Sequence, residues 1–332
     1  RSPDSCDVLG ISDSDRDYYR ANEDFVRSLG IQMACSCTPY QVGNVPVKGE
    51  HCAWMESSAV AYINGALGAR TNCEGNASTL AAMLTGKIPN WGYHKDDYRL
   101  GTHLIEVETP VTTFEDWGLL GYYAGLEIQD KVPVINNISV QPTKDMLKQF
   151  GAAAASSGGL EMYHIAGITP EAPTVEDAFG GHSPREVLRF GWEEKKQIYE
   201  KINCTAKSDD IDLVMLGCPH YSLEQMFYLS RLLDGKKIKD SVSFWIFVPK
   251  AIKTASAESG YSEKIEKAGA HIMAYACPAM GHLLPKGAKV MCTDSGKQAH
   301  YMPNMTGIQC WYGSTEECVN ASITGKWEGH LK

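Results

Sequence analysis

The sequence predicts an α/β fold with parallel sheets flanked by helices. Three observations support this class: short apolar runs of strand length, stretches of helical periodicity between them, and glycine or proline where one element gives way to the next. With 332 residues, of which 43% are hydrophobic and 21% are charged, the chain is long enough for a large core and for more than one lobe.

The first expected elements are a helix and a strand–helix–strand unit. Residues 56–68 predict a helix that stops at Gly68, because its apolar residues form one stripe: Ala59, Val60, Ile63 and Leu67. Residues 132–138 and 162–168 predict strands, and residues 144–157 between them predict a helix. This order is typical of an α/β protein.

The most regular alternation lies over residues 212–280. Its strand candidates are apolar throughout, and they cover residues 213–217, 242–248 and 270–276. Ser222 and Gln225 form a capping box that opens a helix ending near Gly235, and the next helical stretch is broken at Gly260. Strands without polar alternation are buried on both faces, so the region predicts a βαβαβ unit with a parallel sheet.

The composition excludes several classes of partner. A net charge of −9 argues against a nucleic-acid partner, and no apolar run is long enough to span a membrane. No basic stretch followed by an apolar one opens the chain as a secretory signal would. The eleven cysteines are odd in number and lie beside core-like runs, which favours a reducing compartment. We therefore expect a cytoplasmic protein.

Three cysteines share an unusual position. Cys37, Cys218 and Cys277 each follow an apolar run, and each is followed within two residues by proline. In open α/β sheets, ligands bind beyond the carboxyl ends of the strands, and parallel strands present those ends at one edge. Three convergent thiolates would form a soft metal site. The alternative that stays open is three unrelated buried cysteines at strand ends.

Residues near the predicted helix at 56–68 are candidates for substrate binding. Glu56, Ser57 and Ser58 open this helix, whose N-terminal N–H groups could hold a substrate carboxylate. Arg70 and Asn72 lie just beyond its far end. The simpler alternative is that the opening residues only cap the helix.

Two more candidates lie near the second and third cysteine segments. His220 follows Cys218 by two residues and is a candidate ligand or acid/base, unless it is a structural histidine. Lys297 lies in a Gly- and Ser-containing turn that could meet an anion, although a solvated lysine is the common case.

Five segments together resemble the large subunit of the aconitase X family. They follow the order of the family and cover residues 35–75, 167–174, 212–222, 277–280 and 290–307. The resemblance extends over nearly the whole chain and implies aconitase-like interlocked lobes with parallel sheets flanked by helices. We expect one large catalytic domain over residues 1–332, incomplete at its N-terminus, with approximate lobes 1–130 plus 281–332, and 131–280.

The resemblance also implies an activity and a cofactor. Members of the family resemble hydro-lyases that dehydrate cis-3-hydroxy-L-proline or mevalonate 5-phosphate. The cysteines that would hold an iron–sulfur cluster, [2Fe–2S] or [4Fe–4S], map onto Cys37, Cys218 and Cys277. Cys35 is an extra neighbour, and Cys292 stands where threonine is expected, so neither is included.

Family members also use a small swivelling domain or subunit that supplies a catalytic serine. No such domain is visible in this sequence, so we expect either that a partner chain provides it or that this chain is a fragment. Glu56 is then the local alternative for the base. The resemblance makes Ser57, Arg70, Asn72 and Lys297 expected contacts of a small hydroxy acid.

Hydroxyproline is the first expected substrate, because a chain rich in Cys, Met and Asn does not suggest a hyperthermophile. Mevalonate 5-phosphate is the alternative within the same class. Two alternatives from other classes also stay open: a zinc enzyme that uses Cys218, His220 and Cys277, and a non-catalytic scaffold subunit.

Overall fold

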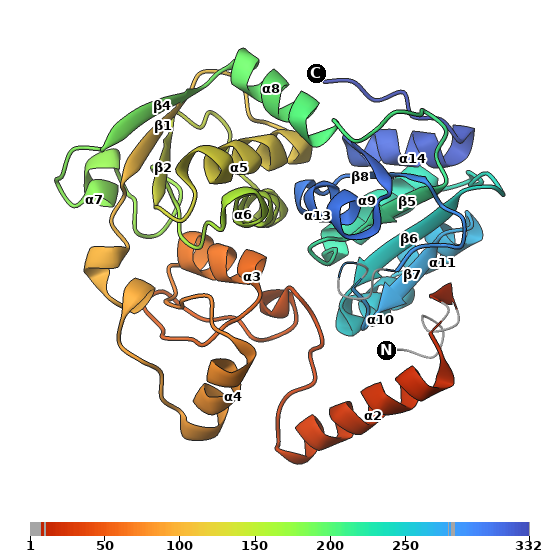
Figure 1. The fold of residues 1–332 in the computed structure, drawn as a ribbon, viewed down its shortest axis with the longest axis horizontal. Helices are drawn as coiled ribbons and strands as arrows, with labels where there is room; N and C mark the ends of the chain where they lie inside the picture. The colour runs from red at the N-terminus through yellow and green to blue at the C-terminus, as the bar shows by residue number, and fades with distance from the viewer. Residues whose placement is uncertain (1–7, 10, 278, 280–282, 332) are drawn as a thin grey trace.

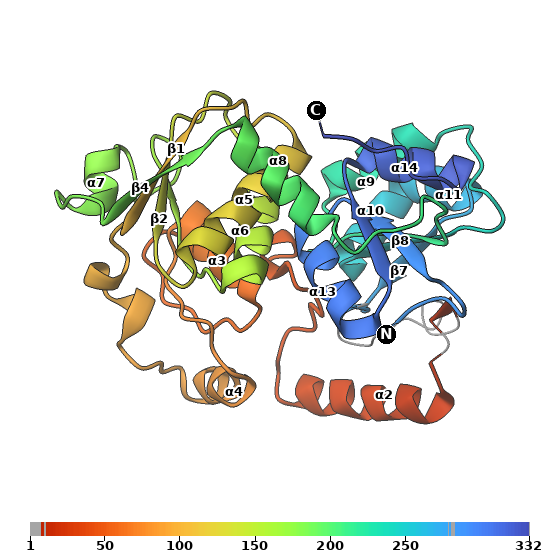
Figure 2. The same ribbon diagram turned by 45° about the horizontal axis from the view of Figure 1, so that its top comes forward.

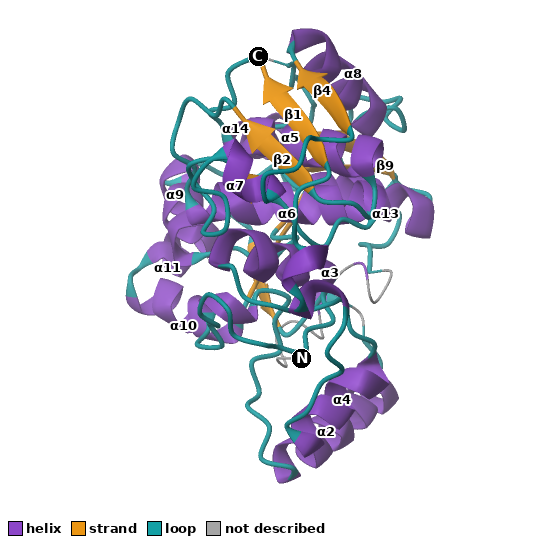
Figure 3. Cartoon of the chain, turned by 90° about the vertical axis from the view of Figure 1, so that its left-hand side faces the viewer, coloured by secondary structure: helices purple, strands orange, loops and turns teal. Residues whose placement is uncertain are grey.

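The computed structural model describes residues 8–9, 11–277, 279 and 283–331, and its framework is a pair of parallel sheets (Figures 1 and 3). The first sheet has the order β3-β2-β1-β4, with β1 at His103–Val107, β2 at Pro133–Asn136, β3 at His164–Ile165 and β4 at Glu186–Phe190. The second has the order β7-β6-β5-β8-β9, with β5 at Leu213–Leu216, β6 at Ser243–Val248, β7 at His271–Ala274, β8 at Val290–Thr293 and β9 at Gln309–Tyr312. Every strand pairing is parallel, which confirms the predicted class.

The largest core lies between the two sheets, around central helices (Figure 1). These helices are α5 (Phe114–Ile128), α6 (Lys144–Gly158) and α13 (Gly296–Thr306). Ile105 of the first sheet and Trp245 and Met291 of the second belong to this one cluster, together with Phe150 of α6. Because apolar residues from both sheets pack in this one cluster, the hydrophobic effect holds the two sheets together.

The outer face of each sheet has its own cover. The helices α9 (Leu223–Leu233), α10 (Lys250–Glu258), α11 (Tyr261–Lys267) and α14 (Thr315–Thr324) cover the second sheet, and α7 (Val175–Phe179) covers the first. Along β5, Val214 and Leu216 pack outward, whereas Leu213 and Met215 pack into the central core. This burial on both faces explains the unbroken apolar run of the strand. The remaining long helix of this half, α8 (Trp192–Ile202), packs on α5.

The predicted helix boundaries agree closely with the structure. Ser222 and Gln225 form the capping box of α9, and Gly260, with φ of 75°, separates α10 from α11. The helix expected at residues 56–68 is α3 (Ser57–Tyr62), which continues as the π-turn η2 (Ile63–Leu67).

The expected lobes divide the chain differently from the sheets. The division at residue 130 separates β1 from β2, although these strands pair. The division at residue 281 separates β5 from β8, which also pair. Hydrophobic patterning locates single strands but carries no signal for which strands become neighbours, so sheet membership was not predictable from it.

The N-terminal third is more open than the rest. It contains α2 (Asp13–Ser28), α4 (Asn76–Thr85) and three short 3-10 turns, η1 (Pro39–Gln41), η3 (Gly92–His94) and η4 (Asp96–Tyr98). None of the described residues of α2 and α4 is buried, and both helices stand at the same end of the molecule (Figures 1 and 2). Within the part of the chain that the structure describes, no helix combines the length and apolar character needed to cross a membrane.

Close packing of α5 against α6 depends on glycine. A Cβ atom at Gly121 would overlap the backbone carbonyl of Phe150, which cannot move independently of its helix. We expect Gly121→Ala to lower the free energy of unfolding by roughly 3 kcal/mol, because overpacking forces backbone shifts. Gly75→Ala is the control, since its nearest neighbour would be Ser78 Oγ at 3.8 Å. Urea unfolding of both variants measures the difference, and equal stability would contradict the packing argument.

Candidate functional site

The cysteine segments meet at a hollow of about 310 Å³, here called the thiol hollow. Cys35, Cys37, His220 and Cys277 line it, together with Tyr19, Glu23, Ser36, Tyr275 and Ala276. Cys218 lies close enough to interact electrostatically with both Cys37 and Cys277. Within the described residues, none of these thiols forms a disulfide. The structure therefore brings together the three cysteines that the sequence singled out.

Local backbone geometry places Cys218 just beyond the carboxyl end of β5, a central strand of the second sheet. The strand β5 ends at Leu216, and Gly217 has φ of 92°, in the left-handed region that favours glycine. A side chain at Gly217 would also overlap the backbone of Phe247. The Cys218–Pro219 peptide bond is cis, and the Tyr221 N–H donates to the Phe247 carbonyl at 3.0 Å. These contacts hold the turn against β6.

Burial makes the thiols hard to ionise in the absence of a metal. It raises the pKa of Cys37 to about 11, and the carboxylate of Glu56 acts in the same direction. Burial also raises the pKa of Cys218, while the ammonium group of Lys297 partly opposes this effect. Metal binding to such thiols would release protons.

The donor set fits a cluster better than a single ion. Among residues 8–9, 11–277, 279 and 283–331, no group of three His, Cys, Asp or Glu side chains is arranged to hold one metal ion. In a [4Fe–4S] cluster each cysteine binds a different iron, and in a [2Fe–2S] cluster two cysteines share one iron, so in neither case do three sulfur atoms have to meet at one metal ion. The zinc alternative also requires a free His220 nitrogen, but Nδ1 contacts Ser36 Oγ at 3.1 Å and Nε2 contacts the Ala276 carbonyl at 3.1 Å.

A partly buried ion pair lies beside the thiols. Lys297 Nζ donates to Glu56 Oε1 and lies 3.4 Å from Ser58 Oγ. Lys297 belongs to the first turn of α13, whose N-cap residue Ser295 donates its hydroxyl to the Cys218 carbonyl. The helix α13 therefore connects the ion pair directly to the second cysteine segment.

The pair is fully charged near neutral pH. Burial alone would raise the pKa of Glu56, but the charge and hydrogen bond of Lys297, together with hydrogen bonds from Ser58 and the Ala59 N–H, lower it. Burial alone would lower the pKa of Lys297, but Glu56 and the neighbouring Cys218 and Cys37 raise it instead. The site therefore holds an ammonium group and a carboxylate side by side.

Glu56 changes the expected role of the α3 N-terminus. Its carboxylate accepts the Ala59 N–H at 2.8 Å and the Ser58 hydroxyl at 2.5 Å. The helix is thus capped by the protein's own carboxylate, which takes the place that a substrate carboxylate was expected to occupy. Ser57 is half-buried at the first position of α3. Glu56 also lines a second hollow of about 530 Å³, beside Ser36, Trp54 and Met55.

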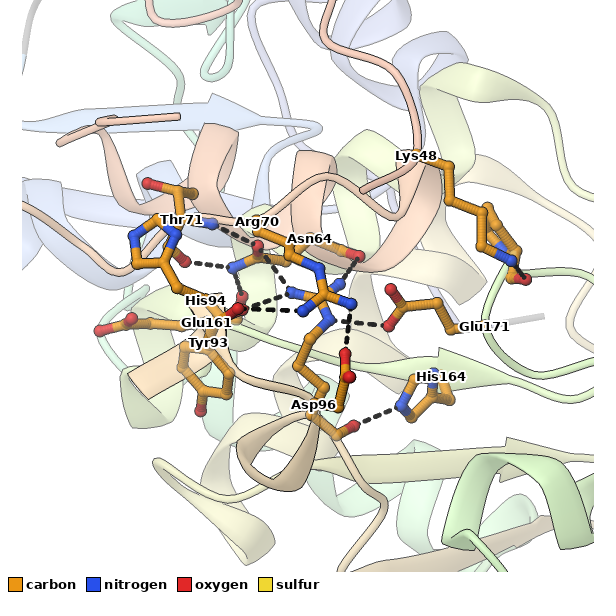
Figure 4. A network of polar contacts seen from close by, with 12 residues as sticks. Lys48, Asn64, Arg70, Thr71, Tyr93, His94, Asp96, Glu161, His164 and Glu171 are labelled. Atoms are coloured by element: carbon orange, nitrogen blue, oxygen red, sulfur yellow. Dashed lines mark hydrogen bonds and ion pairs between the residues drawn. The ribbon is translucent and has the colours of Figure 1, made fainter. Parts of the chain in front are cut away.

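Arg70 and Asn72 do not line the thiol hollow, and Arg70 belongs to a separate polar network (Figure 4). Arg70 donates to the His94 carbonyl at 2.9 Å and pairs with Asp96. The Asn72 amide donates to the Trp91 carbonyl at 3.2 Å and accepts the Tyr93 N–H at 2.9 Å. Both follow the far end of α3 and η2, where the chain turns back and runs beside residues 50–54, with bridges from His51 to Arg70 and from Trp54 to Cys73. The structure shows their polar groups engaged in this network, and the expectation that they contact the substrate stays a prediction.

Sequence reasoning missed the polar residues behind the hollow. Lys148 is 1% exposed, pairs with Asp145 at 2.8 Å and donates to the His220 carbonyl at 3.1 Å. Asp294 is buried and accepts hydrogen bonds from Tyr221 and from Thr315, the latter at 2.8 Å. The available signal was the position of Lys148, which follows Met146 and Leu147 and precedes Phe150 on the expected helix.

Asp294 predicts a pH dependence of stability. Burial raises its pKa from 3.8 to about 6, so the folded state binds the proton more tightly than the unfolded state. Its contribution to stability is therefore present below pH 4 and is lost as the pH rises through about 6. As the pH rises over this range, the free energy of unfolding of Asp294→Asn should fall by roughly 2 kcal/mol less than that of the wild type. Urea unfolding from pH 4 to 7 measures this, and parallel pH profiles would contradict it.

The parallel-sheet α/β fold with thiols at a strand edge defines an aconitase-like protein. Sequence models of the aconitase X first, second and third domains match residues 3–97, 101–200 and 211–324. The chain belongs to the aconitase X family. A solved relative, aconitase X of Thermococcus kodakaraensis in its holo-form, is 32% identical with a TM-score of 0.83, and the match covers 94% of this chain and 78% of that one.

Curated relatives have two names. The phosphomevalonate dehydratase large subunit of Methanocaldococcus jannaschii is 37% identical over 299 residues, which are 88% of this chain and 72% of the relative. The cis-3-hydroxy-L-proline dehydratase of Pseudomonas aeruginosa is 35% identical over 303 residues, which are 90% of this chain but only 52% of the relative. Both names denote dehydratases, so the hydro-lyase class expected from the sequence is confirmed at the level of the family.

Proposed function

We propose that the protein dehydrates a small hydroxy acid at an iron–sulfur cluster bound by Cys37, Cys218 and Cys277. The proposal rests on one observation: three thiols lie close together beside the partly buried Lys297–Glu56 ion pair. The aconitase X family supports an iron–sulfur cofactor in general, and the donor set fits one.

The protein's own residues would bind and orient the substrate. When bound, the cluster would supply a Lewis-acidic iron for the departing hydroxyl group. The ammonium group of Lys297 would attract the substrate carboxylate, and Glu56 keeps that ammonium in place. Because the pKa of Glu56 is lowered, its carboxylate is a weak base at neutral pH. The Ser58 hydroxyl already donates its hydrogen bond to Glu56, so Ser58 is not an available base either.

A partner chain would complete the site. The relatives named phosphomevalonate dehydratase are large subunits, which implies that they have a smaller partner. We propose that such a partner supplies the base, a serine, on the open side of the thiol hollow. To test this, an affinity-tagged copy of this chain is expressed and purified together with any smaller polypeptide that binds it. A co-purifying polypeptide that restores turnover supports the proposal, whereas full activity of the chain alone would contradict it.

Two substrates compete for this site. cis-3-Hydroxy-L-proline is supported by relatives that match 90% of this chain, at 35% identity in a bacterium and 32% in the fungus Hypocrea jecorina. Mevalonate 5-phosphate is supported by relatives whose length this chain matches more fully. It also requires a cationic phosphate pocket, for which a partner chain could supply side chains.

The assay separates these substrates and the two other classes. Anaerobically purified protein with its partner is mixed with each compound, and product is followed by mass spectrometry. Dehydration of one compound only identifies the substrate, and dehydration of neither, in protein that contains iron and sulfide, removes both. A colourless protein with stoichiometric zinc would support a zinc lyase, and a folded complex without metal would support a scaffold.

A further inference from the structure

We propose that His220 is a positioning residue that fixes the three cysteine segments relative to one another. The proposal rests on the proposed function, because it assigns His220 to the same cluster site. It differs from the role expected from the sequence, in which His220 would contact the metal or the substrate directly.

Every polar atom of His220 contacts a different part of the site. Its backbone N–H donates to Cys37 Sγ at 3.3 Å, and its carbonyl accepts from Lys148 Nζ at 3.1 Å. Its ring contacts Ser36 Oγ through Nδ1 and the Ala276 carbonyl through Nε2, both at 3.1 Å. Ser36 precedes Cys37 and Ala276 precedes Cys277. One residue, two positions after Cys218, therefore joins all three segments.

The two ring contacts define the tautomer. A carbonyl oxygen only accepts hydrogen bonds, so Nε2 carries the proton toward Ala276. In the neutral ring Nδ1 is then an acceptor, and the Ser36 hydroxyl donates to it. No amide side chain reproduces both contacts. Glutamine places an N–H near the position of Nε2, whereas asparagine places an acceptor near the position of Nδ1.

Burial distinguishes positioning from direct chemistry. His220 is only 4% exposed, and both ring nitrogens are engaged with the protein. A ligand or an acid/base would need one nitrogen directed at the metal or the substrate. The N–H to sulfur contact with Cys37 belongs to the kind of outer hydrogen bond that orients ligands and tunes metal sites.

The test compares two half-mimics with a matched control. His220→Gln keeps the bond to Ala276, and His220→Asn loses it while retaining an acceptor for Ser36. His164→Asn is the control, because His164 is 2% exposed and its Nε2 also contacts a carbonyl, that of Arg99 at 2.7 Å, in the network of Figure 4, so asparagine removes the same kind of bond away from the cysteines. Thermal unfolding of each apoprotein first establishes that all three fold.

The first readout is the rate of cluster loss to a chelator, followed by visible absorbance and iron content. We expect about tenfold to hundredfold faster loss in His220→Asn, the range for outer-sphere partners of metal ligands. We expect nearly wild-type loss in His220→Gln and in His164→Asn. Equal rates in His220→Asn and the wild type would overturn the proposal. An equal acceleration in His164→Asn would also overturn it, because general destabilisation would then explain the effect.

The second readout uses the apoprotein and does not depend on a cluster. Alkylation by iodoacetamide is mapped to single cysteines by mass spectrometry, and we expect Cys277 to react about tenfold faster in His220→Asn, with Cys73 unchanged. If the wild type binds no iron but Cys277 still responds, the proposed function fails and the positioning role stands. If alkylation is unchanged in both His220 variants, the positioning role fails regardless of iron content.

Discussion

Replacing Lys297 with methionine is expected to lower kcat/KM by about 10³-fold, within the range for a charged group that acts on the reacting substrate. The ammonium group is the cation that faces the Glu56 carboxylate beside the thiols, and methionine keeps the apolar stem without the charge. The Glu56 side chain is only 29% exposed, so its carboxylate would lose its main partner in a poorly hydrated place. We also expect a loss of stability of roughly 3 kcal/mol.

The pH dependence separates the charge from the packing. In the wild type, Lys297 lowers the pKa of Glu56, so Glu56 stays ionised as the pH falls. In Lys297→Met, burial raises that pKa, so the contribution of Glu56 to the free energy of unfolding should be lost as the pH rises, whereas in the wild type it is lost as the pH falls; urea unfolding across pH measures this. Lys253→Met is the control, because Lys253 donates to a backbone carbonyl, that of Ile272 at 2.8 Å, and takes no part in the ion pair. Similar losses in both variants would contradict a specific role for Lys297.

The second large effect is expected at the cysteines. Replacing Cys37, Cys218 or Cys277 singly with serine should remove at least about 90% of the bound iron and lower activity at least about 100-fold. Serine keeps the size of the side chain but is a poor ligand for iron. Cys37 and Cys277 line the thiol hollow, and Cys218 lies beside both. Losing one of them would leave an iron of the proposed cluster without its protein ligand.

Cys204→Ser controls for the loss of a thiol as such, because Cys204 is exposed and does not line the thiol hollow. Iron and sulfide analysis with circular dichroism measures the outcome. Serine variants that keep full iron content while folded would rule out these cysteines as ligands. Variants without iron that keep full activity would instead remove the cluster from the mechanism.

The fold could be predicted wherever local pattern and burial agree. The strand at β5, the capping box of Ser222 and Gln225, and the break at Gly260 all follow from side chains within a few residues. The pairing of β1 with β2 and of β5 with β8 could not be predicted, because it is decided by packing around the central core. The expected lobes therefore separated strands that lie side by side.

The site was predictable to a similar degree. Cys37, Cys218, Cys277, Glu56 and Lys297 have sequence signals, namely strand ends, a helix start and a turn. Arg70 and Asn72 follow the same helix as Glu56, but the chain turns back beside residues 50–54 and their side chains bond to residues 91–96. Lys148 and Asp294 became visible only when burial and hydrogen bonds were known, because their importance comes from their neighbours.

Contacts at the thiol hollow join residues that are distant in the chain. Lys297 and Glu56 are 241 positions apart, and Ser36 and His220 are 184 apart. Closing such long loops has an entropic cost that is recovered only after both sheets have formed, so the hollow belongs to the late events of folding. A nascent chain still leaving the ribosome would present its cysteines separately. The proposed iron–sulfur cluster would then be inserted only into the finished polypeptide.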